Sequence, residues 1–225
     1  MSALTVSAQQ KVKVSDLDLT KMKQEYGVAL VGKTVTAEAA RINGVAYKDA
    51  IGTHAKSVLK ILLEKDALRF SADVGVADCG TNPEDGSLAV SPLVDGTKIL
   101  WKRNGEEKQF AGLVGKNGKI ERGSVCFVVK GDGKELFNSG VVRGGESPVH
   151  VDVDLKGVSL LEMYALPTDD GASGDHALWI SPEIEYTAKA PRTTDAGAID
   201  QGPEMTGETA NRLMRKMKEL PVFKS

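Results

Sequence analysis

The sequence contains little cysteine, few aromatic side chains and no long apolar run. Its two cysteines, Cys79 and Cys126, are too few for a disulfide-stapled scaffold of 225 residues, and they could form one bridge or both stay free. A membrane-spanning helix needs ~18 consecutive apolar residues. The best apolar run, residues 27–32, is bounded by Glu25 and Lys33. The sequence therefore predicts no membrane span.

The chain also lacks a strong charge of either sign. It has 29 Lys and Arg residues against 31 Asp and Glu residues, a formal net charge of −2. This balance produces no overall field that would attract a polyanion, so nucleic acid is not expected as a partner. The apolar fraction of 41% and the charged fraction of 27% are typical of a globular protein and exclude a disordered chain.

The common signatures of catalysis are missing as well. The Gly-Ala-Ser-Gly stretch at 171–174 lacks the spacing of a nucleophile elbow, and the glycine-rich stretches at 112–118 and 131–134 do not end as a phosphate-binding loop does. Three histidines and two distant cysteines show no zinc spacing. Carboxylates are too numerous for a glycosidase pair to be recognised. The sequence predicts no catalytic residue, and a glycan-active enzyme with unidentified carboxylates remains an alternative.

Short strands account for most of the chain. Alternation and β-branched residues predict strands at 28–31, 34–42, 58–63, 68–76, 124–130, 149–155 and 160–166. The clearest is 149–155, where the odd positions are apolar and the even positions carry His150, Asp152 and Asp154. One face of that strand should pack, and the other should meet water.

Turn residues support the same fold class. Asp132 and Gly133 separate two apolar runs, and Asn43 and Gly44 offer a second pair of the type favoured in two-residue hairpins. Crossover helices of ~12 residues are absent between the strands, which argues against a parallel sheet. We expect an all-β protein, a jelly-roll β-sandwich.

Three segments depart from the strand pattern. Residues 1–10 are interpreted as a signal remnant or a disordered N-terminus. Residues 81–121 are rich in Gly, Asn, Lys and Glu and predict a long inserted hairpin. Residues 188–225 predict a linker followed by an amphipathic helix at 206–220, which could pack on this protein or on a partner. The sandwich itself is expected to span 11–187.

Polar residues recur beside glycine-rich turns in an ordered series of motifs. They are Gly-Thr-His-Ala at 52–55, Ser-Ala-Asp-Val-Gly-Val at 71–76, Gly-Asp-Gly-Lys-Glu-Leu at 131–136, Ser-Gly-Val-Val-Arg-Gly-Gly at 139–145, Val-Asp-Val-Asp-Leu-Lys-Gly-Val at 151–158 and Gly-Asp-His-Ala-Leu-Trp at 174–179. This series resembles the NPCBM family (NPCBM/NEW2-like; carbohydrate-binding module family 51) from about residue 15 to residue 186. The resemblance implies a secreted or periplasmic, non-catalytic jelly-roll module that binds galactose-containing or related glycans for an attached or partner glycoside hydrolase.

The resemblance also implies a set of ligand-binding residues. A sugar ring has an apolar C–H face and a ring of hydroxyls, so a binder needs a flat platform together with hydrogen-bond donors and acceptors. Histidine and tryptophan rings can supply the platform, and charged side chains can supply strong hydrogen bonds. The predicted site residues are His54, Asp73, Arg143, Asp175, His176 and Trp179. Each also has a structural alternative, such as a core tryptophan, a buried histidine or a turn-bracing arginine.

Two departures from the family pattern affect the site. Leu178 stands where the family usually has an acidic residue, and residues 81–121 replace a much shorter loop. Both changes bear on sugar specificity, because the inserted loop could cover the site or extend it. If Leu178 and the insertion close the site, the chain is a structural or adhesive module that has lost sugar binding. Trp101, inside the insertion, could be a second sugar platform or could pack the hairpin on the sandwich.

An acidic loop offers a candidate metal site. Asp169, Asp170 and Asp175 are closely spaced oxygen ligands of the kind that suits Ca²⁺, so a structural Ca²⁺ is possible although no cofactor is required. The loop is not an EF-hand, because Ile180 stands where that motif needs its bidentate glutamate. A solvated turn is the alternative.

Overall fold

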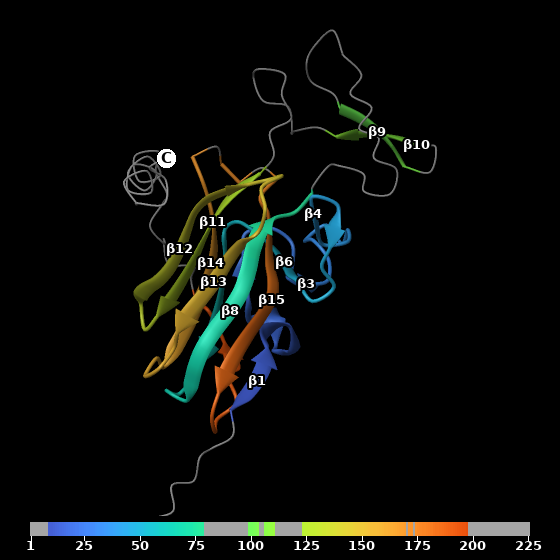
Figure 1. Ribbon diagram of the computed structural model, residues 1–225. Coiled ribbons are helices and arrows are strands. Elements are labelled where there is room, and N and C mark those ends of the chain that lie inside the picture. The colour runs from blue at the N-terminus through green and yellow to red at the C-terminus, as the bar shows by residue number, and fades with distance from the viewer. Residues whose placement is uncertain are drawn as a thin grey trace, which may run out of the picture.

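Two antiparallel β-sheets pack face to face as a sandwich (Figure 1). This computed structural model describes residues 9–78, 123–169, 171–172 and 174–197, and only the backbone of 99–103 and 106–110. The all-β, two-sheet prediction is confirmed, whereas the jelly-roll connectivity stays a prediction. Among the described residues, no helix has the length and hydrophobicity needed to cross a bilayer.

The first sheet, here the β15 sheet, has the strand order β13-β8-β15-β6-β3, with β1 also paired to β15. Its strands are β13 (Val149–Asp154), β8 (Ala67–Val76), β15 (His176–Tyr186), β6 (Ile51–His54), β3 (Leu30–Val31) and β1 (Gln10–Lys13). All these pairings are antiparallel. Strand β15 is therefore the centre of this sheet and contacts three neighbours.

The second sheet, here the β11 sheet, has the order β12-β11-β14-β7-β16, with β2 also paired to β7. Its strands are β12 (Lys134–Arg143), β11 (Ser124–Gly131), β14 (Leu160–Pro167), β7 (Ser57–Leu62), β16 (Arg192–Thr194) and β2 (Lys23–Gln24). Two 3₁₀ turns, η1 (Val14–Asp16) and η2 (Leu19–Lys21), precede β2. Two further hairpins are β4 (Arg41–Ile42) with β5 (Val45–Ala46) and β9 (Ile99–Arg103) with β10 (Glu106–Phe110).

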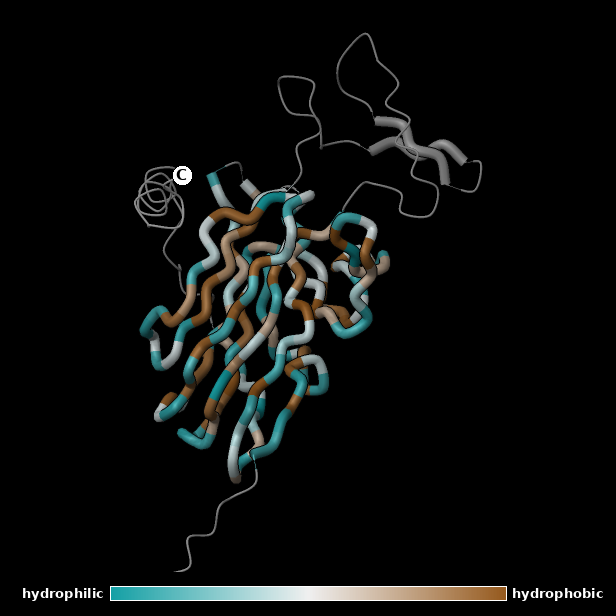
Figure 2. Tube along the Cα trace, viewed as in Figure 1, coloured by the Kyte–Doolittle hydropathy of each residue, from teal (hydrophilic) through white to brown (hydrophobic). Residues whose placement is uncertain are grey.

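The main core lies between the sheets, where the inward-facing residues of both sheets meet. Hydrophobic and hydrophilic residues alternate along several strands, as the colouring of the chain trace in Figure 2 shows. Strand β13 follows the prediction: Val151 and Val153 are buried, and His150, Asp152 and Asp154 are exposed. Both predicted turns are also confirmed, since the two residues of each turn have positive φ.

The outer faces of both sheets carry smaller apolar clusters. Leu178 and Ile180 point away from the main core and pack under Ala40, Ile42 and Ala50, from the segment between β3 and β6. On the β11 sheet, a cluster around Cys126, Val128 and Tyr164 includes Ala196, which follows β16. The central strands are thus buried on both faces, in the way that parallel strands usually are.

Several predicted segments differ from the structure. The strand expected at 34–42 is wrong for most of its length, because only Arg41 and Ile42 form a strand and the rest is a loop that covers the β15 sheet. Residues 192–194 of the expected linker are strand β16. The hairpin β9–β10 falls inside the predicted insertion at 81–121. The amphipathic helix at 206–220 lies outside the described residues.

The sequence left open whether the two cysteines form a disulfide or stay free, and the structure describes one of them. Cys126 is free and fully buried on β11, and burial raises its pKa to about 12. Its thiol therefore stays protonated at neutral pH and packs as a small apolar group. Cys79 lies outside the described residues.

Candidate functional site

One end of the sandwich, here called the rim, brings both sheets together around Asp175. There β6 ends at His54, β15 begins at His176, β11 begins at Ser124 and β12 ends at Arg143. The buried Asp175 carboxylate accepts a hydrogen bond from the Ser124 backbone N–H at 2.8 Å, which ties the start of β15 to the β11 sheet. The register places Ser124 opposite Arg143. The rim thus contains four of the six predicted site residues.

Three aromatic rings lie next to one another at the rim. His54 and His176 are direct partners across β6 and β15, and their ring centroids are 5.6 Å apart. The ring of Tyr26 also contacts His54, at a centroid distance of 5.1 Å. Tyr26 is 56% exposed, whereas His54 is 9% exposed. The row therefore presents one open ring that is backed by two imidazoles.

Burial keeps both imidazoles neutral. It lowers the pKa of His54 and lowers that of His176 to about 4, with the neighbouring His54 as a second cause for His176. His54 donates from Nδ1 to the carbonyl oxygen of Ala55, which leaves Nε2 as an acceptor. Nδ1 of His176 is buried and has no hydrogen-bond partner within the described part of the chain. Neutral rings of this kind suit an uncharged ligand.

Acidification is expected to destabilise the protein through His176. Between pH ~6.5 and about 4 the unfolded chain binds a proton that the folded chain excludes. The stabilisation is complete above the unfolded pKa and is lost as the pH falls toward 4, by on the order of 2 kcal/mol. Urea denaturation at pH 7 and pH 4.5, for wild type and His176→Gln, isolates this contribution because carboxylate titration is common to both. An identical pH dependence in the two proteins would contradict it.

Trp179 does not belong to the rim. Its indole is 1% exposed in the main core and makes edge contacts with Phe70 and Phe127, at centroid distances of 6.3 and 5.3 Å. A side chain sealed in this way offers no face to a ligand. The structure places it in the core, the structural alternative considered from the sequence.

Asp73 also lies away from the rim. It stands within β8 on the outer face of the β15 sheet, where one of its carboxylate oxygens is 2.7 Å from Nδ1 of His150. Both side chains are about half exposed or more. Leu178, whose identity raised the question of a closed site, packs in the cluster under Ala40 and Ile42 instead. That departure from the family pattern therefore stabilises a covered sheet face, and Leu178 does not project into the rim.

The described residues of the acidic loop do not gather as a cluster of metal ligands. Within the described part of the chain, no three His, Cys, Asp or Glu side chains gather as metal ligands. Asp175 is buried and is engaged by the Ser124 backbone, Asp169 follows β14, and Asp170 lies outside the described residues. Trp101 is on β9, but its side chain is outside the described set.

Tyr26 is the residue that sequence reasoning missed. It is one isolated aromatic residue before Gly27, which has a positive φ of 69° and whose added Cβ would lie 2.5 Å from Val35. This glycine allows the tight turn that presents the tyrosine ring beside His54. The only signal in the sequence is a large aromatic residue in a polar stretch just ahead of the first predicted strand, at 28–31.

Comparison with known proteins gives one family and a group of solved structures. The profile of the NPCBM/NEW2 domain matches residues 10–103 and 97–185. CBM51 from Clostridium perfringens GH95, in complex with methyl-galactose, superimposes with a TM-score of 0.55 at 20% identity, and the match covers 78% of this chain and 99% of that one. A second structure, from Clostridium perfringens ZmpB, contains the INT domains and CBM51-2, the latter in complex with GlcNAc. It matches with a TM-score of 0.57 at 16% identity, and the match covers 95% of this chain and 36% of that one.

A third structure contains a pair of such modules. The tandem CBM51 modules of Sp3GH98, a family 98 glycoside hydrolase from Streptococcus pneumoniae, match with a TM-score of 0.54 at 16% identity, covering 79% of this chain and 47% of that one. At these identities the likeness establishes the fold. The chain spans about a third of the ZmpB structure and about half of the Sp3GH98 structure. No curated protein matches the sequence.

Proposed function

Because the chain belongs to the NPCBM/NEW2 family, we propose that it is a non-catalytic carbohydrate-binding module whose rim holds a sugar. The observation that carries this proposal is the row of Tyr26, His54 and His176, an open aromatic ring backed by two neutral imidazoles. A tyrosine ring offers an apolar face to the C–H groups of a pyranose and a hydroxyl to its polar edge. Tyr26 thus takes the role that the sequence assigned to Trp179.

The polar residues of the rim complete the site. Arg143, at the exposed end of β12, supplies a guanidinium that can donate to ring hydroxyls. The buried Asp175 fixes the backbone from which His176 projects. The ligand class that fits neutral imidazoles is an uncharged sugar, galactose-containing or a related N-acetylhexosamine, as in the complexes of the structural relatives.

Replacing Tyr26 with alanine is expected to weaken sugar binding at least tenfold without unfolding the protein, since the ring is 56% exposed. Affinity for a monosaccharide should be on the order of 1 mM, because ~0.3 kcal/mol per non-hydrogen atom, the low end of the usual range, gives ~4 kcal/mol for about 13 such atoms. Isothermal titration with methyl-galactose and GlcNAc measures the loss. Val45→Ala, which truncates another exposed apolar residue, is the matched control. Unchanged binding by Tyr26→Ala would remove the platform from the proposal.

We further propose a biological setting for this module. It is secreted or periplasmic and directs an attached or partner glycoside hydrolase to a glycan; the structural relatives include modules of glycoside hydrolases and of ZmpB with its M60 catalytic domain. Absence of binding to a glycan array by the folded protein would instead favour a structural or adhesive module. Turnover of an oligosaccharide panel would favour an enzyme.

The Ca²⁺ prediction for the loop at 169–175 stays a prediction, beside the solvated-turn alternative. A bound ion stabilises the folded state by mass action, so the two can be separated by thermal denaturation. A melting temperature that rises with added CaCl₂ and falls with EDTA supports the ion. Equal melting temperatures support the turn.

A further inference from the structure

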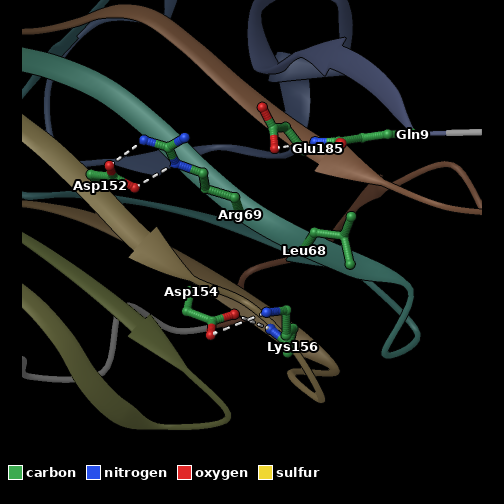
Figure 3. Close-up of a pocket in the computed structure, with 7 residues that line it drawn as sticks. All are labelled: Gln9, Leu68, Arg69, Asp152, Asp154, Lys156 and Glu185. Carbon is green, nitrogen blue, oxygen red and sulfur yellow. Dashed lines mark hydrogen bonds and ion pairs between the residues drawn. The ribbon is translucent and has the colours of Figure 1, made fainter.

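A pocket of about 310 Å³ opens on the outer face of the β15 sheet, at the end opposite the rim (Figure 3). It lies where β8 begins and where β13 and β15 end, whereas the rim lies at the other ends of β8 and β15. Five charged side chains and the amide of Gln9 line it, and Leu68 contributes apolar surface. None of its residues takes part in the rim.

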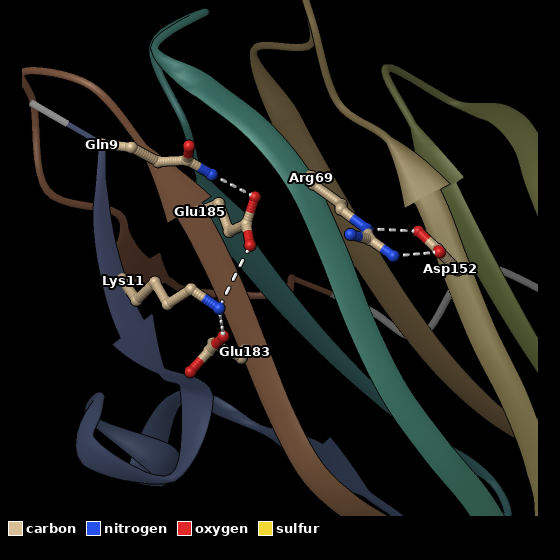
Figure 4. A network of polar contacts seen from close by, with 6 residues as sticks. All are labelled: Gln9, Lys11, Arg69, Asp152, Glu183 and Glu185. Atoms are coloured by element: carbon tan, nitrogen blue, oxygen red, sulfur yellow. Dashed lines mark hydrogen bonds and ion pairs between the residues drawn. The ribbon is translucent and has the colours of Figure 1, made fainter. Parts of the chain in front are cut away.

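Ion pairs fix the positions of the charged walls (Figure 4). The Arg69 guanidinium makes two hydrogen bonds to the Asp152 carboxylate from the neighbouring strand, one of them at 2.6 Å from Nε to Oδ1. The Glu185 carboxylate accepts from Gln9 and lies 3.1 Å from the Lys11 ammonium. A bidentate arginine–carboxylate pair fixes the planar guanidinium and the planar carboxylate in one relative orientation. The pocket therefore presents ordered polar groups even though they are exposed.

Both donors and acceptors remain available toward the pocket. Arg69 has more N–H groups than the two that Asp152 accepts. The Lys156 ammonium is only loosely paired, at 4.0 Å from Asp154 Oδ2. Each carboxylate oxygen that accepts one bond keeps capacity for another. A ligand in this pocket would meet donors and acceptors side by side.

This mixture gives neither an anion nor a cation a lining of opposite charge alone. An anion would be attracted by Arg69 and Lys156 but would face the carboxylates of Asp152, Asp154 and Glu185. A cation would be attracted by these carboxylates but would face Arg69 and Lys156. A hydroxyl group donates and accepts at once, so neighbouring hydroxyls on a neutral ring can use both kinds of partner. The apolar surface of Leu68 can contact the C–H face of such a ring.

We propose that this pocket is a second saccharide-binding site, separate from the rim and specific for an uncharged, polyhydroxylated ring. Its volume is at the lower end of the range for small-molecule sites, which fits one or two sugar residues. Two weak sites at opposite ends of one module can engage two branches or two chains of a glycan. Such bivalency raises avidity without any new contact.

Titration of the ¹⁵N-labelled full chain with methyl-galactose and with GlcNAc, followed by NMR, tests the proposal. We expect amide shifts near Arg69, Asp152 and Glu185 that saturate independently of any shifts near the rim. The double variant Arg69→Ala with Asp152→Ala removes both charges of the pair, so no lone charge is left. It should weaken binding at the pocket at least tenfold and leave rim shifts unchanged.

The control is Glu64→Gln, which weakens an exposed ion pair with Lys189 outside the pocket and should change neither set of shifts. Rim shifts without pocket shifts overturn the second site alone. Pocket shifts that persist in the double variant, or that sodium sulfate or free lysine produces at lower concentration than either sugar, overturn it as well. Pocket shifts in a protein whose rim does not respond support the second site and argue against the rim.

Discussion

Replacing Trp179 with alanine is expected to lower the free energy of unfolding by about 3–5 kcal/mol, the range for deleting a large aromatic side chain from a core. The indole is 1% exposed and has Phe70 and Phe127 against its edges, so its removal leaves a cavity between the two sheets. Neighbouring strands cannot close that cavity without shifting backbone hydrogen bonds of β15. Urea denaturation followed by circular dichroism measures the change.

The matched comparison is Tyr26→Ala, which should leave the urea midpoint nearly unchanged while it reduces sugar binding. The two aromatic residues thus separate stability from recognition. If Trp179→Ala kept wild-type stability and lost only sugar binding, the core position of the indole would be refuted. Trp179→Phe should show an intermediate loss of stability, because the smaller ring retains part of the contacts with Phe70 and Phe127.

Replacing Gly52 with alanine is expected to cost about 3 kcal/mol, or to prevent folding at 37 °C. A Cβ at this position would lie 1.9 Å from the carbonyl oxygen of Lys33 and 2.9 Å from the Thr34 Cα. Both obstacles are backbone, and Gly52 is paired with β3 and β15, so neither side can move freely. The substitution would push the covering segment off the outer face of the β15 sheet and expose Leu178.

Gly75→Ala is the control for this prediction, because Gly75 is also a direct partner of Leu178 across the sheet. Its added Cβ would meet the Cδ1 end of Ile42 at 2.5 Å, which is the tip of a flexible side chain. We expect a loss below about 1.5 kcal/mol. Thermal and urea denaturation of both variants provide the comparison, and equal losses would show that the close approach at Gly52 is not rigid.

Much of the fold could be predicted from local pattern. Strand β13 alternates strictly because one face meets water, and the Asp132 and Gly133 turn requires the positive φ that these residues tolerate. The pattern at 34–42 wrongly predicted a strand. Its apolar residues are buried against the outer face of strand β15, and this burial does not require the segment to form strand hydrogen bonds of its own. Strand β15 was not predicted at all. It is buried on both faces around Trp179 and so shows no alternation.

The site could be predicted only in part for a related reason. The motifs containing His54, Asp175 and His176 mark strand ends that the topology brings to one rim, and the resemblance carried that information. Whether an aromatic residue faces the core or solvent depends on strand phase and on what covers the sheet. Tyr26 meets His54 only because strand β6, far along the chain, brings that imidazole beside it.

Strand β16 has a practical consequence for anyone who trims this domain. Strands β2 and β16 share one edge of β7, with β2 along Ser57 and Val58 and β16 along residues 60–62. A recombinant fragment that stopped at 185, where the family match ends, would leave half of that edge with unpaired amide and carbonyl groups. It would also remove Ala196 from the apolar cluster around Tyr164. Unpaired strand edges promote hydrogen bonding to another chain and aggregation. The shortest fragment that resists aggregation should therefore extend to residue 197 at least.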